Sequence, residues 1–117
     1  MGLLRTLRGK IHPRDGIRIN AVCPTFTETG MTASLVEEMR NLGKVSNTAD
    51  DVAKYVLGLE VSTNRNGQAI YVEGGRAWEF EEGLEKTMPL WLGKEPCERM
   101  EDDRKLMQAR KARTSYT

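Results

Sequence analysis

The apolar residues of the first 75 positions follow two kinds of pattern. Two short runs, at residues 17–23 and 68–72, are rich in β-branched and aromatic side chains, which fit the pleated surface of a sheet. Elsewhere apolar residues recur every three or four positions, which is the spacing of an amphipathic helix. The pattern therefore predicts strands at the two runs and helices at residues 2–9, 32–42 and 49–59.

Local signals indicate where these elements begin and end. Pro24 cannot donate to a sheet ladder, so the first strand is expected to stop there. The segment from His12 to Gly16 is interpreted as a turn, because proline and glycine punctuate it. Gly74 and Gly75 are interpreted as the end of the second strand.

The two later helices have predicted caps. Ser34 with Glu37, and Thr48 with Asp51, have the spacing of a capping box. For Asp50 and Asp51 we favour capping over catalysis, since acidic residues are common in the first turn of a helix. Gly43 is expected to close the earlier helix. The apolar residues expected on the buried side of the later helix are Val52, Val56, Leu57 and Leu59.

Two strands separated by helices cannot form a hairpin, so a crossover must join them, and they should run parallel with a right-handed connection. The predicted fold class is therefore α/β, with one βαβ unit. A two-stranded parallel sheet leaves an apolar edge and at least one face uncovered. We therefore interpret residues 1–75 as part of a domain with a larger sheet.

Residues 76–117 differ in composition from the part before them. Trp78, Trp91 and several leucines stand among glutamates, and Pro89 and Pro96 are expected to interrupt any long helix. Residues 98–113 have few apolar positions, so they form either a solvated helix or a disordered segment. The two tryptophans either pack on the domain or contact a partner.

Composition limits the classes of function. The chain has 117 residues, within the range of one domain, and its net charge of +1 gives no general attraction to nucleic acid or membrane. Cys23, Cys97 and the single histidine have no metal-ligand spacing, so neither a zinc site nor a disulfide framework is expected. Reduced thiols and the lack of a secretory signal or transmembrane run indicate a cytoplasmic protein.

The loop after the first strand carries a motif. Residues 16–31 read GIRINAVCPTFTETGM, and seven of them fit R-[VI]-N-x-[IV]-x-P-G-x-[VI]-x-T-x-M, namely Arg18, Ile19, Asn20, Val22, Pro24, Thr29 and Met31. This stretch resembles the penultimate strand and loop of short-chain dehydrogenases/reductases. Thr25 stands where the family has glycine, and Phe26 follows one residue later.

A second block strengthens the resemblance. T-A-D-D-V-A at residues 48–53 and N-G-Q-A-I-Y-V-E-G-G at residues 66–75 are similar to the family's closing helix and last strand, in the same order and spacing. The resemblance covers residues 2–75, the C-terminal half of such a protein, and implies a partial Rossmann fold. The later residues resemble the C-terminal extensions of some fungal members, which wrap toward the substrate side or a partner subunit.

The resemblance implies where a cofactor would bind. Pro24, Thr25 and Phe26 correspond to the loop whose backbone meets the carboxamide of NAD or NADP, and Thr29 to the hydroxyl that contacts the carboxamide or the adjacent phosphate. Residues 30–45 correspond to the mobile substrate lid. No residue of this chain is assigned a catalytic or metal-binding role. The amide of Asn20 has a structural alternative, which is to satisfy neighbouring backbone groups.

The family's catalytic chemistry has no counterpart in this sequence. It uses a Ser/Tyr/Lys set, with Tyr-x-x-x-Lys, and a glycine-rich turn that holds the pyrophosphate. None of the three tyrosines is followed four residues later by lysine. By collinearity the Tyr-x-x-x-Lys motif is expected upstream of Met1.

The sequence thus predicts an oxidoreductase by descent, truncated and inactive alone, whose family passes hydride between NAD or NADP and an alcohol or ketone. A second interpretation is a non-catalytic interaction or regulatory module that pairs with a full-length relative. The resemblance also implies a homo-oligomer, because family members associate through their last strand and the helix that Leu3 begins here. The substrate, and the choice of NAD or NADP, are not encoded in this part.

Overall fold

The computed structural model describes residues 1–114, in which the chain forms two compact units. The first runs from Met1 to Glu82 and the second begins at Gly83, so the first unit extends past Gly75. Each unit is described by itself. None of the helices in residues 1–114 is long and apolar enough to cross a membrane.

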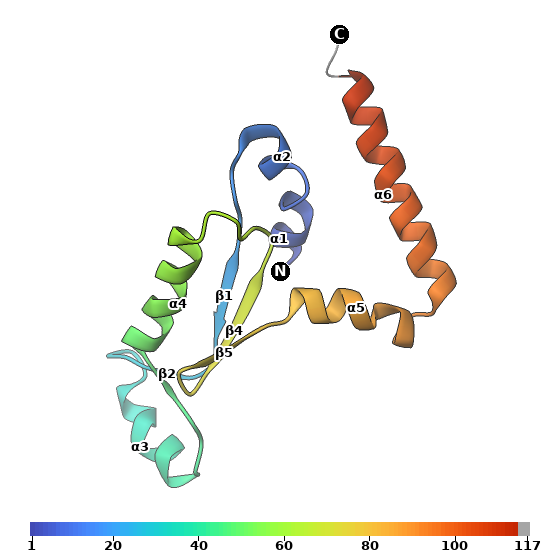
Figure 1. Ribbon diagram of the computed structural model, residues 1–117. Helices are drawn as coiled ribbons and strands as arrows, with labels where there is room; N and C mark the ends of the chain where they lie inside the picture. Colours follow the sequence, from blue (N-terminus) through green and yellow to red (C-terminus); the bar gives the residue numbers. More distant parts are fainter. Residues whose placement is uncertain (115–117) are drawn as a thin grey trace. The chain divides into compact units, whose positions relative to one another are not determined.

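The first unit is built on a three-stranded sheet with the order β1-β4-β5. Its strands are β1 (Ala21–Pro24), β4 (Ala69–Glu73) and β5 (Arg76–Glu79). β1 and β4 are parallel, with Val22 beside Ile70, and the helix α4 (Ala49–Val61) lies between them in the chain and along one side of the sheet (Figure 1). The predicted α/β class and the predicted parallel pairing are confirmed.

β1 begins later than predicted and includes Pro24 as its last residue. Residues 17–20 lie outside the ladder because the segment beside them is the loop that precedes β4, not a strand. The backbone N–H of Ile19 donates to Oδ1 of Asn66 at 3.0 Å, and its carbonyl accepts from the N–H of Gly67 at 2.7 Å. The proline is tolerated because β1 is at the edge of the sheet, where one side of the strand needs no donor.

The strand β5 was not predicted. Gly74 and Gly75 have φ of 57° and 74°, so they form a tight two-residue turn, and the chain returns antiparallel to β4. Two consecutive residues with positive φ are typical of hairpin turns, and glycine adopts this conformation without strain. Gly74 and Gly75 therefore do not end the sheet, but lead into a further strand.

The core of the first unit is small. Leu59, Ile70 and Val72 are buried together, with Tyr55 packed against them. The prediction that Val56 and Leu57 face the core is wrong, since they are 48% and 58% exposed. The buried stripe of α4 runs instead through Tyr55 and Leu59, four residues apart and so one turn along the same face.

The N-terminal residues form two short helices, α1 (Gly2–Leu7) and α2 (Ile11–Asp15). Leu4 is the buried residue of α1. The segment predicted as a turn is helical as far as Asp15, because Pro13 lies in the first turn, where its missing N–H has no intrahelical partner to lose. Gly16 then ends α2 in the left-handed conformation, with φ of 69°.

A side excursion joins β1 to α4. Its base is a second, two-stranded parallel ladder of β2 (Thr27–Glu28) and β3 (Asn47–Thr48), and it carries the helix α3 (Ala33–Asn41). The predicted capping box at Ser34 is wrong. Thr32 holds the N-cap position, and its hydroxyl turns back to the loop, so the side chain makes no cap hydrogen bond.

The other predicted caps are confirmed. The hydroxyl of Thr48 accepts from the N–H of Asp51 at 3.1 Å, and the Asp51 carboxylate accepts from the N–H of Thr48 at 2.8 Å, which is the reciprocal capping box of α4. These bonds hold the pKa of Asp51 below its usual value. Gly43 follows α3 with φ of 66°.

The second unit is helical. α5 (Glu81–Trp91) begins at the end of the first unit, and α6 (Lys94–Thr114) follows after Gly93. Pro89 does not interrupt α5, which continues to Trp91, and Pro96 lies in the first turn of α6. For residues 98–113 the helical alternative is confirmed, while residues 115–117 lie outside the described part.

Candidate functional site

The loop after β1 is fastened to the end of β4. The backbone N–H and the hydroxyl of Thr25 both donate to the carbonyl of Val72, at 2.9 and 3.1 Å. The hydroxyl of Thr27 donates back to the carbonyl of Thr25 at 2.9 Å. The side chain that replaces the family's glycine is therefore used to hold the loop against the neighbouring strand.

Asn47 is the residue that organises this loop, although no local sequence pattern marks it. Its side chain is fully buried, and Nδ2 donates to the carbonyl of Val72 at 3.0 Å and to the Thr25 hydroxyl at 3.3 Å. Its Oδ1 accepts from the N–H of Gly75 at 3.0 Å. One amide thus ties together the loop after β1, the end of β4 and the hairpin turn.

Pro24 and Phe26 lie at the carboxyl end of β1. Pro24 is exposed and stands beside Val72 in the ladder, and Phe26 is half-buried, with its carbonyl accepting from the N–H of Asn47 at 2.9 Å. In open parallel sheets ligands bind beyond the carboxyl ends of the strands. The position of both residues suits a ligand-facing loop.

Thr29 is exposed and retains a largely free hydroxyl. Its backbone N–H donates to Oγ1 of Thr32 at 2.9 Å, which fixes the turn, whereas the two hydroxyls are 3.3 Å apart. The Thr32 hydroxyl gives its proton to the carbonyl of Thr27 at 2.6 Å. The turn is therefore held by Thr32, and the Thr29 hydroxyl remains able to bond a ligand.

The segment predicted as a lid is anchored at its base and exposed along its length. The Glu28 carboxylate accepts from the Ser46 hydroxyl at 2.6 Å, and Arg40 stands 3.9 Å from the same oxygen. None of the residues of α3 is buried. The contacts of Glu28, which the sequence did not reveal, therefore hold the two ends of the excursion together.

Two residues of the sequence motif have structural roles. Arg18 donates to four carbonyls around the end of α4, those of Leu59, Glu60, Ser62 and Arg65, at 2.8 to 3.1 Å. Asn20 accepts from the N–H of Gln68 and donates to the carbonyl of Arg65, both at 3.0 Å. The structural alternative for Asn20 is confirmed.

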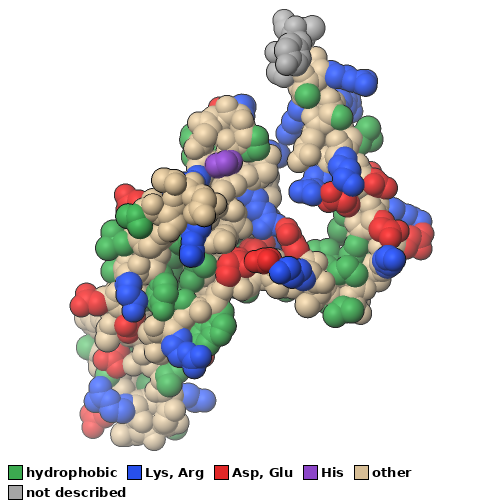
Figure 2. Space-filling view, viewed as in Figure 1, with side chains coloured by type: hydrophobic (Ala, Val, Ile, Leu, Met, Phe, Trp, Pro, Cys, Tyr) green, Lys and Arg blue, Asp and Glu red, His purple; other side chains and the backbone are tan. Residues whose placement is uncertain are grey.

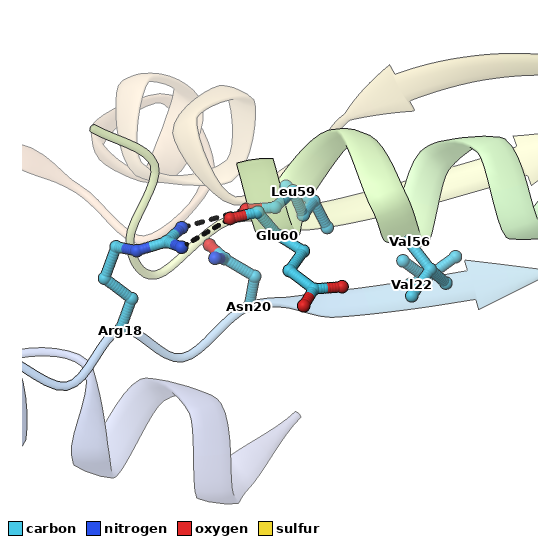
Figure 3. A pocket seen from close by; sticks show the side chains of 6 residues that line it. All are labelled: Arg18, Asn20, Val22, Val56, Leu59 and Glu60. Atoms are coloured by element: carbon cyan, nitrogen blue, oxygen red, sulfur yellow. Dashed lines mark hydrogen bonds between the residues drawn. The ribbon is translucent and has the colours of Figure 1, made fainter. Parts of the chain in front are cut away.

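The cavity in Figure 3 is not at the predicted cofactor residues. It has a volume of about 340 Å³ and lies between β1 and α4, lined by Arg18, Asn20, Val22, Val56, Leu59 and Glu60. A second hollow of about 420 Å³ lies between α4 and the β4–β5 hairpin. Neither is lined by Pro24, Thr25, Phe26 or Thr29. The first is an open groove beside the edge strand β1.

The two tyrosines of the first unit bond to neighbouring groups of the chain. The Tyr55 hydroxyl donates to the carbonyl of Gly75, and the Tyr71 hydroxyl to Glu73. Partial burial, and then the charge of Glu73, raise the pKa of Tyr71, which makes its phenol a weaker acid. Within residues 1–114 no three His, Cys, Asp or Glu side chains are placed to hold a metal ion.

Two curated proteins are similar to the chain. In an alignment 116 positions long, gaps included, it is 34% identical to the short-chain dehydrogenase/reductase ATR7 of Stachybotrys chlorohalonatus, covering 81% of this chain and 36% of that protein. It is 36% identical over 84 residues to the 3-oxoacyl-[acyl-carrier-protein] reductase FabG of Aquifex aeolicus, covering 64% of this chain and 33% of that protein. No protein-family model and no solved structure matches the chain.

The chain spans about a third of the length of these relatives. The match to ATR7 covers 81% of the chain, and residues 1–75 make up a smaller share than that. The match therefore includes part of the segment after Gly75.

Proposed function

Because the chain is related to the short-chain dehydrogenases/reductases and corresponds to part of one, we propose that it supplies one wall of a nicotinamide-cofactor site. The whole protein would transfer hydride between NAD or NADP and an alcohol or ketone. In this proposal the first unit is the C-terminal part of a Rossmann sheet, and its loop from Pro24 to Thr29 faces the cofactor.

The observation that carries the proposal is the loop at the carboxyl end of β1. β1 lies parallel to β4, and Asn47 and Thr25 fasten the loop to the end of β4. The exposed Thr29 hydroxyl follows directly after this fixed segment. A hydroxyl held on a rigid backbone can donate to or accept from a carboxamide, so these residues fit the nicotinamide end of a cofactor.

In this proposal the cofactor, this chain and the rest of the protein have different roles. When bound, NAD(P) would supply the hydride acceptor or donor. This chain's residues would orient the carboxamide and exclude water on one side, while proton transfer would need groups from elsewhere. Tyr55 and Tyr71 are bonded to Gly75 and Glu73 and have no lysine beside them in the motif's spacing. We therefore propose that the isolated chain has no turnover.

Purified chain incubated with NADH or NADPH and a panel of ketones tests this proposal. The expected result is no oxidation of either cofactor above the buffer rate, because general acid–base catalysis alone contributes about 10² to 10⁴ in rate. Turnover that persists in independent preparations and is lost on Tyr71→Phe would contradict the assignment of the chemistry to groups outside the chain.

One observation favours the second candidate, a module that pairs with a full-length relative. The outer edge of β1 has no partner strand among the described residues, and Ile17, Val56 and Leu57 are exposed. A sheet edge of this kind pairs readily with another chain. Co-purification of the chain with full-length ATR7, in the absence of any catalytic complementation, would favour this role.

The two cysteines are free thiols, which suits a reducing compartment, so a cytoplasmic location remains our prediction.

A further inference from the structure

The charges of α6 are divided between its two halves. Residues 94–103 hold five acidic and two basic side chains, and residues 104–113 hold five basic side chains and no acidic one. The acidic residues are Glu95, Glu98, Glu101, Asp102 and Asp103, and the basic ones are Arg104, Lys105, Arg110, Lys111 and Arg113. Figure 2 shows acidic side chains together with some basic ones over the lower part of this helix, and mainly basic ones over the upper part.

The helix dipole accounts only for the ends of this pattern. Glu95 in the first turn and Lys111 and Arg113 in the last turn have the signs that the dipole favours. The dipole effect falls off within one turn of each end. The change of sign from Asp103 to Arg104, in the middle of a helix of 21 residues, therefore needs another explanation.

Two methionines mark one side of the helix at this point. Met100 and Met107 are 50% and 57% exposed, and their spacing of seven residues places them on the same side. Asp103 and Arg104 lie between them on that side. Within residues 1–114, Asp103 makes no ion pair, whereas Arg104 bonds Glu101 through Nε and Nη2 and is also attracted by the charge of Glu85 in α5.

We propose that this side of α6 pairs with α6 of a second copy of the chain in antiparallel orientation, centred between Asp103 and Arg104. In that register Met100 lies against Met107 of the second copy, and Asp103 lies against its Arg104. Each contact occurs twice because the pair is two-fold symmetric. A parallel pair would instead place the acidic halves together and the basic halves together, so charge decides the orientation.

This pairing does not depend on the oxidoreductase proposal, because it uses only residues of α6. It also concerns a surface other than the last strand and the first helix, through which the resemblance implies association.

Charge exchange tests the pairing on the whole chain. The basic variant Asp102→Lys/Asp103→Lys and the acidic variant Arg104→Glu/Lys105→Glu should each self-associate at least about tenfold more weakly than the wild type in sedimentation equilibrium. Mixed together, they should form a heterodimer. Glu37→Lys/Glu38→Lys, with the same change in net charge on the exposed face of α3, should leave self-association unchanged. Circular dichroism verifies that every variant keeps its helix content.

Cysteine pairs test the register. In a Cys97→Ala background, Met100→Cys and Met107→Cys chains should form a disulfide with each other on mild oxidation, and neither should cross-link with itself. Peptide mapping separates this bond from any made by Cys23. Self-cross-linking of the Met100→Cys chain would contradict the antiparallel orientation.

A wild-type chain that stays monomeric at every concentration tested would overturn the proposal. So would a monomer that binds vesicles of anionic lipid and loses this binding in Arg110→Glu/Lys111→Glu, because the basic half would then belong to a different partner.

Discussion

Arg5 of α1 binds the carboxylate of Glu81, at the start of α5, through three hydrogen bonds of 2.7, 3.0 and 3.1 Å. Arg8 adds a fourth at 3.2 Å, and the glutamate is only 3% exposed. Seventy-six residues separate Arg5 from Glu81. The first helix is therefore fastened to the segment that follows the hairpin, so this segment belongs to the fold of the first unit.

The first prediction concerns this contact. Glu81→Ala should lower the free energy of unfolding by about 1 to 3 kcal/mol, because two arginines lose their buried acceptor. The loss stays below that of a fully buried pair because Arg5 is half exposed and is solvated when released. Urea denaturation measures the change. Glu38→Gln, on the exposed face of α3, is the control and should be neutral.

The same contact predicts a dependence on pH. Hydrogen bonds from Arg5 hold the pKa of Glu81 below its usual 4.5, against the opposing effect of burial, and the charges of Arg5 and Arg8 lower it further. The stabilisation is therefore complete above the pKa of the unfolded state and is lost as pH falls through the lower pKa of the folded state.

Stability curves of the wild type and Glu81→Gln, measured between pH 7 and pH 2, should thus converge at the acidic end. A difference between the two proteins that stays constant over this range would show that the ionisation of Glu81 does not contribute.

Asn47 provides the third prediction. Asn47→Ala should destabilise the first unit by about 2 to 3 kcal/mol, since it leaves the buried carbonyl of Val72 and the N–H of Gly75 short of partners. Asn64→Ala, in an exposed loop, is the matched control. Hydrogen exchange should localise the effect of Asn47→Ala to the hairpin turn and the loop after β1. An equal loss of unfolding free energy in the two variants would contradict the claim that Asn47 organises the loop.

The fourth prediction is that the isolated chain is marginally stable. Its core of buried residues is small, β1 has an open edge, and exposed Val56 and Leu57 leave apolar area in water. Thermal unfolding followed by circular dichroism should therefore show a broad or low transition. A cooperative transition of a monomer well above about 50 °C would mean that the unit needs no neighbour.

The sequence predicted those features that depend on local chemistry. The capping box of Thr48 and Asp51 is a short-range pair, and the parallel pairing of β1 with β4 follows from apolar runs separated by helices. The hairpin was not predicted, although Gly74 and Gly75 are a recognised turn signal. The two glycines were interpreted as the end of the sheet because the similarity to the family's last strand ends at Gly75. In addition, β5 has the sequence RAWE, in which apolar and polar residues do not alternate, so no strand pattern is visible there.

The rest depends on contacts far apart in the chain. Asn47 is buried only because Val72 and Gly75 arrive beside it, and Glu81 is buried only because α1 brings two arginines to it. Neither residue stands in a local pattern that distinguishes it from a surface amide or a solvated glutamate. Likewise, the commitment of the Thr25 hydroxyl to β4 follows from the sheet pairing.

The final prediction concerns cofactor binding by a chimera of this chain and ATR7. We would replace the third of ATR7 that aligns with this chain by the aligned part of this chain, and compare Thr29→Val with Thr63→Val in that chimera. Thr63 lies in an exposed loop and is the control. Loss of the Thr29 hydroxyl should weaken cofactor binding about threefold to tenfold, the value of one neutral hydrogen bond, and Thr63→Val should not change it.

Equilibrium binding of NADH and NADPH to the unsubstituted chimera, measured by fluorescence titration beside ATR7 itself, tests the central claim most directly. If this chain supplies a wall of the cofactor site, the chimera should bind the cofactor that ATR7 prefers with an affinity within about tenfold of ATR7. A chimera that unfolds cooperatively, and so is folded, but binds neither cofactor while ATR7 does would contradict the claim.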